Sequence, residues 1–585
     1  MNATTTLRRG ADWLFTNDAP PPFTPEDLSE EHRLIAQTAD EFMRKEVLPV
    51  LDQLETKDWA LARNLVKRAG DLGLLGTDVP EAFGGIDLDK AAAIVVGEVM
   101  GLSASWATTF GAQTGLAIIP ILCFGTPEQQ QKYLPRIVSG ELVGAYCLSE
   151  SGSGSDALGA RARATKQADG SWVLNGEKMW ITNGGFADLY IVFAKVDGEH
   201  FSAFLVESSF PGVSHGKEEH KMGLHGSSTT PVILQDARVP AENLLGEIGK
   251  GHKIAFNVLN YGRFKLAGMC GGGAKMVVGE AARYAATRRQ FGQPIASFGA
   301  IKHKLAEMTI RAYATESALY RTTGLIDAQI AASGGGSSAA LAALEEFAIE
   351  ASILKVASSE MIDFVLDENV QVHGGNGFVK DYAAERHYRD ARVNRIFEGT
   401  NEINRLLVPG MIIKRALKGG LPLISAAKAL QDELLAPPAA GTSSGAPGAA
   451  DLAGMKKAAI MVLGLAMQTY GMALEQEQEV LMLASDIIME AYHAESVLAR
   501  AATATAANHP LAALHNDTAL VFTHDAALRV DAAARAAIQA MTAGDTQRTM
   551  LAALRRMLKV TPINTIAARR RIADVVIDKK AYPFG

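Results

Sequence analysis

One carboxylate in an unusual setting is the first feature of this sequence that could perform chemistry. Glu398 follows an Ile-Phe pair and precedes Gly399, within the segment Arg395–Glu402. The apolar neighbours should partly desolvate the carboxylate, which would raise its pKa and make it a stronger base than an exposed one. Gly399 lets a ligand approach the backbone, and Thr400 and Asn401 add short hydrogen-bonding groups. This pattern suits a general base, although a solvated carboxylate would also satisfy it.

Four other short motifs combine polar side chains with glycine. Tyr146–Asp156 alternates Gly and Ser, so its N–H groups and hydroxyls could meet an oxygen-rich ligand. Trp180–Gly185 places an indole beside a hydroxyl, and Arg288–Gly292 ends a helical pattern with cations. Gln371–Phe378 interrupts a helical pattern with three glycines, and His373 within it is as well explained by structure as by function. Each motif taken alone also suits an ordinary loop, strand end or helix end.

The composition favours a soluble globular protein. The 585 residues allow several domains at ~100–200 residues each, and 48% hydrophobic with 21% charged residues can bury a sizeable core. A net charge of −7 provides no basic face for nucleic acid. Cys123, Cys147 and Cys270 lack metal-site or redox-site spacing, so we predict no metal and expect a reducing compartment. We find no secretory signal and no apolar run of ~20 residues, and we expect a cytoplasmic protein.

The elements that must position these motifs change type along the chain. Residues 24–145 should be helical, beginning at Thr24-Pro25. Residues 146–250 contain strand-like runs, and Asn175-Gly176 between two of them predicts a hairpin. Residues 251–418 show the period of long amphipathic helices.

Two further segments complete the chain. Residues 419–450 are expected to be a linker, rich in Ala, Pro, Gly and Ser towards its end, and residues 451–585 an Ala-rich helical domain. The fold class is therefore α+β, mostly α. The last helices are basic, which a solvated helix face explains; contact with a partner or with a membrane surface is the alternative.

The order and spacing of these motifs resemble the acyl-CoA dehydrogenase family of flavoproteins, over about residues 24–415. The segment Leu259–Phe264 and the additional C-terminal helical domain are most similar to the very-long-chain branch and its larger bacterial relatives. The resemblance implies an N-terminal α-domain, a middle β-barrel, a C-terminal α-bundle and an added helical domain. It also implies FAD as cofactor and acyl-CoA as substrate.

The same resemblance implies roles for particular residues. Glu398 matches the base that removes the α-proton of the acyl thioester, and its backbone N–H would help to hold the thioester carbonyl. Arg288, Arg289 and Gln290, together with Gln371–Gly375, match segments that reach the cofactor of a neighbouring subunit. The implied cofactor-binding residues are Tyr146, Leu148, Ser149, Ser155, Trp180, Ile181, Thr182, Arg288, Gln290, Phe291, Gln371, Gly374, Gly375, Thr400, Asn401 and Glu402. The implied substrate-binding residues are Ser155, Asn260, Arg263, Phe397 and Gly399.

Three positions depart from the family pattern. Ser149 replaces a usual Thr and keeps the hydroxyl, whereas Ser151 replaces a common Pro and could loosen its loop. Position 262 is Gly, whereas branches with a relocated base carry Glu near it. Glu398 is therefore the base that the resemblance supports.

The length of the acyl chain is less clear from the sequence. Ser103, Ala104, Ser105 and Ala107 are small, as a pocket for a long chain requires, although small residues also serve ordinary helix packing. Trp106 lies among them and could face inward to fill the same space.

The resemblance implies desaturation of a saturated, long-chain acyl-CoA to the trans-2-enoyl-CoA in fatty acid β-oxidation. Electron-transfer flavoprotein would accept the electrons, and the added domain would make the protein a homodimer. One alternative is an acyl-CoA oxidase that lets dioxygen reach the flavin. Another is a respiratory-complex assembly or scaffold protein on the same fold, which the intact Glu398, Arg263 and cofactor motifs argue against.

Overall fold

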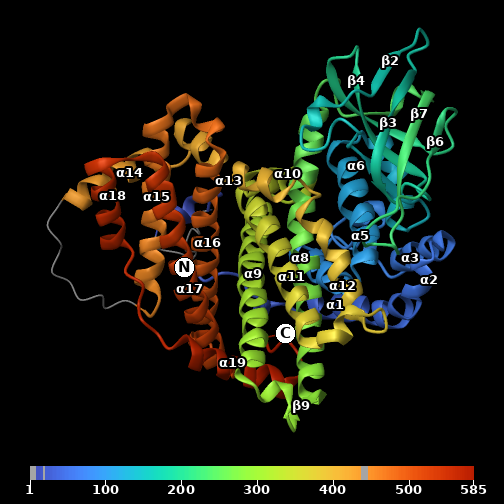
Figure 1. Ribbon diagram of the computed structural model, residues 1–585. Coiled ribbons are helices and arrows are strands. Elements are labelled where there is room, and N and C mark those ends of the chain that lie inside the picture. Colours follow the sequence, from blue (N-terminus) through green and yellow to red (C-terminus); the bar gives the residue numbers. More distant parts are fainter. Residues whose placement is uncertain (1–7, 17–19, 436–445, 585) are drawn as a thin grey trace.

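The computed structural model describes residues 8–16, 20–435 and 446–584. Figure 1 shows one sheet at one end of the molecule, long helices through its middle, and a second group of helices on the far side. Helical, β, helical and again helical regions follow one another along the chain. The predicted class, α+β and mostly helical, is confirmed.

The N-terminal region is a set of helices that begins one turn later than predicted. Ser29 caps the first long helix by accepting a hydrogen bond from the N–H of His32. Thr24 instead forms a capping box with Asp27 on the short 3-10 turn η2 (Pro25–Asp27). The main elements are α1 (Glu30–Phe42), η3 (Met43–Val47), α2 (Leu51–Glu55), α3 (Trp59–Asp71), α4 (Lys90–Met100), α5 (Ala104–Gly111), the π-helical turn η7 (Ala112–Ala117), α6 (Ile118–Phe124) and α7 (Pro127–Val138).

The middle region is one eight-stranded sheet in the order β6-β7-β3-β2-β4-β5-β8, with β1 paired in parallel to β4. Along β4, Leu189, Ile191 and Phe193 join the hydrophobic core shared with the long helices. The alternate residues join a second core with α1 and α3. Both faces of the sheet are therefore covered. The strands are β1 (Gly144–Cys147), β2 (Arg163–Lys166), β3 (Trp172–Thr182), β4 (Leu189–Val196), β5 (His200–Glu207), β6 (Val213–His215), β7 (Thr229–Val239) and β8 (Leu244–Leu245).

The hairpin predicted at Asn175-Gly176 is wrong, because β3 continues through both residues. The pairing of β3 with β7 shifts register between Leu174 and Gly176, which makes this site a bulge. Gly176 has a φ of 152°, and a Cβ there would lie 2.7 Å from that of Ala162. Glycine thus serves a close approach between strands, and β2 and β3 turn earlier, at 167–171.

The long central helices form the bundle that the sequence predicts over 251–418. The longest of them, α8 (Gly251–Thr287), packs beside α4, α9 and α11. After α8 the chain forms a small β9–β10 hairpin before it enters α9. The remaining elements are β9 (Arg289–Gln290), β10 (Gln293–Pro294), α9 (Gly299–Ala332), α10 (Gly336–Glu346), α11 (Ala348–His373), α12 (Ala383–Ala391), η12 (Arg392–Arg395) and α13 (Asn401–Leu417).

The segment predicted as a linker, 419–450, is helical over part of its length. Helix α14 (Leu423–Leu435) lies within it and packs on α15, because Leu423 and Leu430 have a hydrophobic core to join. Residues 436–445 lie outside the described part of the chain. The added domain comprises α15 (Ala449–Tyr470), α16 (Gln478–Ala506), α17 (Ala512–Met541), α18 (Gly544–Met557) and α19 (Thr565–Lys579).

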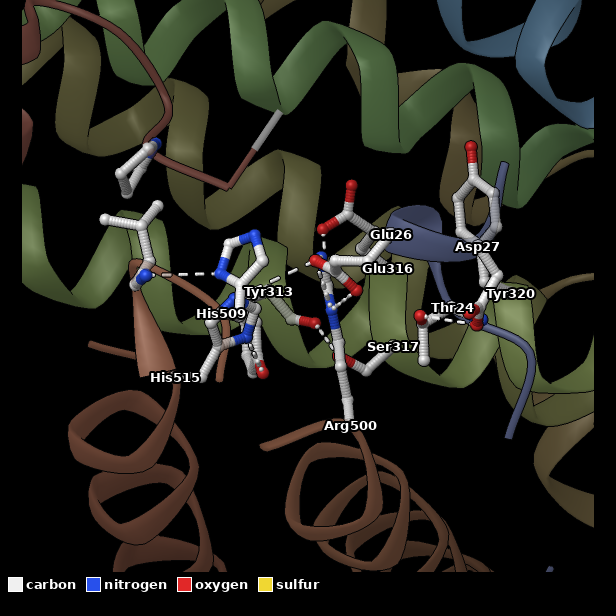
Figure 2. A network of polar contacts seen from close by, with 12 residues as sticks. Thr24, Glu26, Asp27, Tyr313, Glu316, Ser317, Tyr320, Arg500, His509 and His515 are labelled. Atoms are coloured by element: carbon white, nitrogen blue, oxygen red, sulfur yellow. Dashed lines mark hydrogen bonds and ion pairs between the residues drawn. The ribbon is translucent and has the colours of Figure 1, made fainter. Parts of the chain in front are cut away.

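The added domain is joined to the rest of the protein by a buried polar network. Figure 2 shows Arg500 of α16 between Glu26 and Glu316. Its guanidinium donates to Glu26 at 2.5 Å, to Glu316 at 2.7 Å and to the Ser317 hydroxyl at 3.3 Å. Near the C-terminus, Tyr582 donates to the same Glu316 at 2.7 Å. Because Glu26 precedes α1, Glu316 and Ser317 lie on α9 and Arg500 lies on α16, the network ties the added domain to the bundle and to the N-terminal region.

Two helical stretches of the described chain are long and apolar enough to cross a membrane, Ala104–Phe124 and Ala449–Gln476. Of their apolar windows, 72% and 50% are buried inside the protein. Core helices pass the same test, so this is weak evidence for a membrane span.

Replacing Arg500 with alanine should destabilise the protein strongly. The change leaves the partly buried Glu26 carboxylate without its arginine and the buried Glu316 carboxylate with Lys275 as its remaining cation, at a cost of about 3 kcal/mol, the low end for a broken buried pair. Thermal unfolding should show a midpoint lower by several degrees. Arg548→Ala is the control, because its pair with Asp545 is exposed and should add little stability. Equal midpoints for the two variants would show that the network does not hold the domain.

Candidate active site

Glu398 lies in the turn between η12 and α13. The side chain of Thr400 caps α13 by accepting a hydrogen bond from the N–H of Ile403, which sets where the helix begins. Glu398 and Gly399 have φ angles of 57° and 77°, a conformation that is strained for Glu398. The carboxylate lies against α8: a Cβ on Gly262 would come within 2.7 Å of its Oε2. A side chain at position 262 would therefore displace the Glu398 carboxylate from this place.

Three side chains hold this strained turn by its carbonyl groups. Arg263 donates from Nε to the carbonyl of Glu398 at 3.1 Å. Asn404 donates from Nδ2 to the carbonyls of Glu398 at 3.3 Å, Gly399 at 2.9 Å and the next residue at 3.0 Å. Lys355 donates from Nζ to the carbonyl of Gly399 at 2.7 Å. The conformation that aims Glu398 at α8 is thus fixed from α8, α11 and α13.

The electrostatic setting gives Glu398 the properties of a base. Burial raises its pKa to about 7, and the positive charges of Arg263 and Lys355 oppose that rise. Oε2 is buried and has no hydrogen-bond partner among the described residues. Burial likewise lowers the pKa of Arg263 to about 10 and that of Lys355 to about 8. A carboxyl group that titrates near neutral pH can accept and release a proton under physiological conditions.

The carboxylate borders an apolar pocket with about 950 Å³ of space not filled by atoms, its mouth included. The pocket follows one face of α8 from Gly262 to Val277, a distance of roughly 22 Å at ~1.5 Å per residue. Opposite α8 it is lined by α5 and η7, where Gly111 and Gly115 replace bulky side chains. Thr182 and Phe397 also contribute to its wall.

Trp106 does not fill this pocket. It is buried in the other core, where it packs against Phe42, and its indole N–H meets the Met100 sulfur at 3.1 Å. Two of its small neighbours, Ala104 and Ala107, line the pocket, whereas the other two do not. Ser103 caps α5, and Ser105 donates to Asp390. The structure therefore leaves the space open for a long chain.

Several predicted cofactor residues lie in or just after β1 and β3, and one of them, Tyr146, lies close to Glu398. The Tyr146 hydroxyl is buried with no hydrogen-bond partner among the described residues, and the charge of Glu398 acts on it. The Trp180 side chain is 56% exposed and its backbone has a φ of 58°. Gly152 and Gly154 have no atoms within 4 Å of an added Cβ, so their backbone is open. An unpaired hydroxyl, a free aromatic face and open glycines fit a planar, oxygen-rich cofactor.

Other predicted cofactor residues near the sheet face the protein. Leu148 and Ile181 are buried in the two hydrophobic cores, so only their backbone can reach a ligand. The Ser149 carbonyl accepts from the N–H of Met179 at 2.9 Å. Ser155 is exposed.

The residues around α13 and the start of α8 are largely engaged with one another. Asn401 is buried and accepts from Lys355 at 2.6 Å, whereas Glu402 is exposed. Asn260 is 8% exposed and accepts from Arg263 at 3.1 Å. These two asparagines therefore support the Glu398 turn through Lys355 and Arg263.

A third group of predicted residues lies far from Glu398. Arg288, Gln290 and Phe291 follow the end of α8, roughly 39 Å beyond Gly262 at ~1.5 Å per residue. Figure 1 shows this β9 hairpin at the opposite end of the molecule from the sheet. Gln371, Gly374 and Gly375 are exposed at the same end, where Tyr284 stacks on His373. One chain therefore does not bring this group to its own Glu398.

Sequence reasoning missed Lys355 and Asn404. Lys355 stands in the run Ile353-Leu354-Lys355-Val356, and a lysine inside an apolar run is a signal of a buried charge. Asn404 carries no comparable signal, because its role depends on the carbonyl groups of the turn to which it donates.

The site has the layout of an enzyme that removes a proton from an apolar chain. Four family models match the chain in order. They are the acyl-CoA dehydrogenase N-terminal domain over 29–141 and middle domain over 145–237, and two models described as the C-terminal domain, over 249–412 and 454–556. The chain belongs to the acyl-CoA dehydrogenase family.

Individual relatives agree with this assignment. A probable acyl-CoA dehydrogenase of Bacillus subtilis is 46% identical and covers 96% of both chains. The rat very long-chain specific acyl-CoA dehydrogenase is 41% identical over 58% of this chain and 51% of its own length. A crystal structure of an acyl-CoA dehydrogenase complexed with FAD from Bacillus anthracis superposes with a TM-score of 0.96. Its sequence is 46% identical, and the match covers 98% of this chain and all of that one.

The raised pKa of Glu398 predicts how catalysis depends on pH. Only the deprotonated carboxylate can take a proton, so the rate of flavin reduction by substrate should rise with pH through about 7. Anaerobic stopped-flow bleaching across a pH series measures this directly. A midpoint near 4.5, the ordinary value for Glu, would contradict the buried setting described here.

Proposed function

We propose that this protein, an FAD-dependent acyl-CoA dehydrogenase, oxidises long-chain saturated acyl-CoA to trans-2-enoyl-CoA in fatty acid β-oxidation. The chain length is argued from the pocket along α8, which begins beside Glu398 and reaches Val277 between mostly apolar walls. At about 1.25 Å per carbon, the axial step of a chain of ~1.5 Å bonds, roughly 22 Å accommodates about eighteen carbons, enough for a palmitoyl chain.

Each residue of the site has a defined task in this reaction. Glu398 removes the α-proton, for which its pKa of about 7 is suited. Its backbone N–H holds the thioester carbonyl and stabilises the charge that develops on the oxygen. The flavin, when bound, supplies the acceptor for the β-hydride. The apolar walls around Gly262 and Phe397 exclude water from the carbons that react.

We further propose a homodimer in which each copy completes the cofactor site of the other. The residues that would do so, Arg288, Gln290, Gln371 and their neighbours, lie together far from their own Glu398. Two large apolar side chains at this end are almost fully exposed, Phe291 at 93% and Phe378 at 87%. Electron-transfer flavoprotein is the proposed acceptor, and a cytoplasmic location stays a prediction.

Substrate-induced bleaching tests the reaction and the base together. In separate anaerobic cuvettes, palmitoyl-CoA should bleach the flavin band faster than butyryl-CoA. In Glu398→Gln the flavin should remain bound but bleach about 10²–10⁴-fold more slowly, because the base is lost. A flavin-loaded protein that neither thioester bleaches would contradict the straight-chain substrate. Steady peroxide formation without an added acceptor would indicate an oxidase.

The pocket length is tested by filling its far end. Ala104→Leu places a larger side chain in the pocket wall three residues after Gly101, which lies against Gly273, roughly 16 Å along α8 from Gly262 at ~1.5 Å per residue. The bleaching rate with palmitoyl-CoA should fall at least about ten-fold, while the rate with butyryl-CoA in the same variant serves as the control and should change little. An equal fall for both substrates would mean that the long chain does not occupy this space.

A further inference from the structure

A buried lysine, Lys355, donates to the turn that carries Glu398 and has no ion pair with a carboxylate of the described residues. Lys355 on α11 is 0% exposed. Its ammonium donates to the Gly399 carbonyl at 2.7 Å and to Oδ1 of Asn401 at 2.6 Å. No carboxylate within the described residues lies close enough to form an ion pair with it.

Such a charge is costly, so it needs a compensating group. Several kcal/mol oppose burial of an ammonium that is not neutralised by a nearby charge. Three other buried lysines among the described residues meet this demand directly: Lys90 pairs with Asp78 at 2.5 Å, Lys178 with Glu150 at 2.6 Å, and Lys456 with Glu495. Lys265 is the exception, because it donates to the Thr114 hydroxyl and not to a carboxylate. For Lys355 the first opposite charge that acts on it is that of Glu398.

We propose that Lys355 is a positioning residue for the known reaction, which holds the Glu398–Gly399 turn through the Gly399 carbonyl and keeps Glu398 ionised through its charge. This inference rests on Glu398 being the catalytic base. The two effects have one origin, because the ammonium that binds the Gly399 carbonyl of the turn also exerts its charge on the carboxylate that the turn carries.

Other titratable groups near Glu398 and Lys355 also influence the charge of these two residues. Arg263 contributes the other and larger positive charge on Glu398, and Tyr146 is a neutral phenol near the carboxylate. Around Lys355 itself, Glu402 on α13 and Cys270 on α8 also contribute. Lys265 and His387 line the pocket further along.

Removal of the lysine charge should move the pH dependence of catalysis. In Lys355→Met the Glu398 carboxylate loses a stabilising cation, so it holds its proton to higher pH. The acidic limb of the flavin-reduction rate should therefore shift upward by about one pH unit. Activity lost at neutral pH should largely return at higher pH. Lys355→Arg keeps the charge, and its acidic limb should remain near that of the unmodified protein.

Matched variants separate this role from a merely structural one. Lys456→Met also removes a buried lysine, one that pairs with Glu495 in the added domain, and it should leave the acidic limb in place. If Lys355→Met does not fold with flavin, Lys355→Gln carries the same expectation, because its amide can still donate to Gly399. A folded, flavin-loaded neutral variant with an unshifted limb would overturn the proposal.

The base assignment itself is tested separately. Glu398→Gln should bleach slowly at every pH, whatever stands at position 355. If Glu398→Gln bleached at the normal rate, the base assignment would fail. If Glu398→Gln is inactive and the Lys355 variants show no shift, the positioning role alone fails.

Discussion

The active site depends on burying a carboxylate without losing control of its charge. Desolvation alone would leave Glu398 protonated at neutral pH, whereas a direct ion pair would make it too weak a base. The structure avoids both outcomes by placing Arg263 and Lys355 on the backbone carbonyls of the turn rather than on the carboxylate. The cations then act through space, and the pKa settles at about 7.

Helix α8 contributes both to the setting of the Glu398 carboxylate and to the wall of the acyl pocket. Gly262 makes room for the carboxylate, Arg263 supports the turn, and the next turns supply one wall of the acyl pocket. The far end of the same helix carries Arg288 and the β9 hairpin away from the pocket. A rigid helix of this length therefore sets the separation between the chemistry and the residues proposed to serve a neighbouring copy. The added domain braces the neighbouring helix α9 through Arg500.

Local signals predicted much of this organisation and failed where distant contacts decided the outcome. The apolar setting of Glu398 and the loss of a side chain at 262 were readable from the chain. The Asn175-Gly176 pair carries a strong turn signal, but pairing of β3 with β7 along its whole length overrides that preference. The segment 423–435 lies in a stretch of the sequence whose Ala, Pro, Gly and Ser content is typical of a linker. It is nevertheless helical, because Leu423 and Leu430 pack into a hydrophobic core.

The sequence by itself determined the order of the helical and β regions and the family, and it predicted Glu398 as the base, because these depend on short motifs and on periodicity within single elements. Only the tertiary structure decided that Trp106 faces away from the pocket and that Lys355 lies behind Glu398. Both facts depend on the rotation of one helix relative to another. That rotation is set by packing between residues far apart in the chain, which no local pattern records.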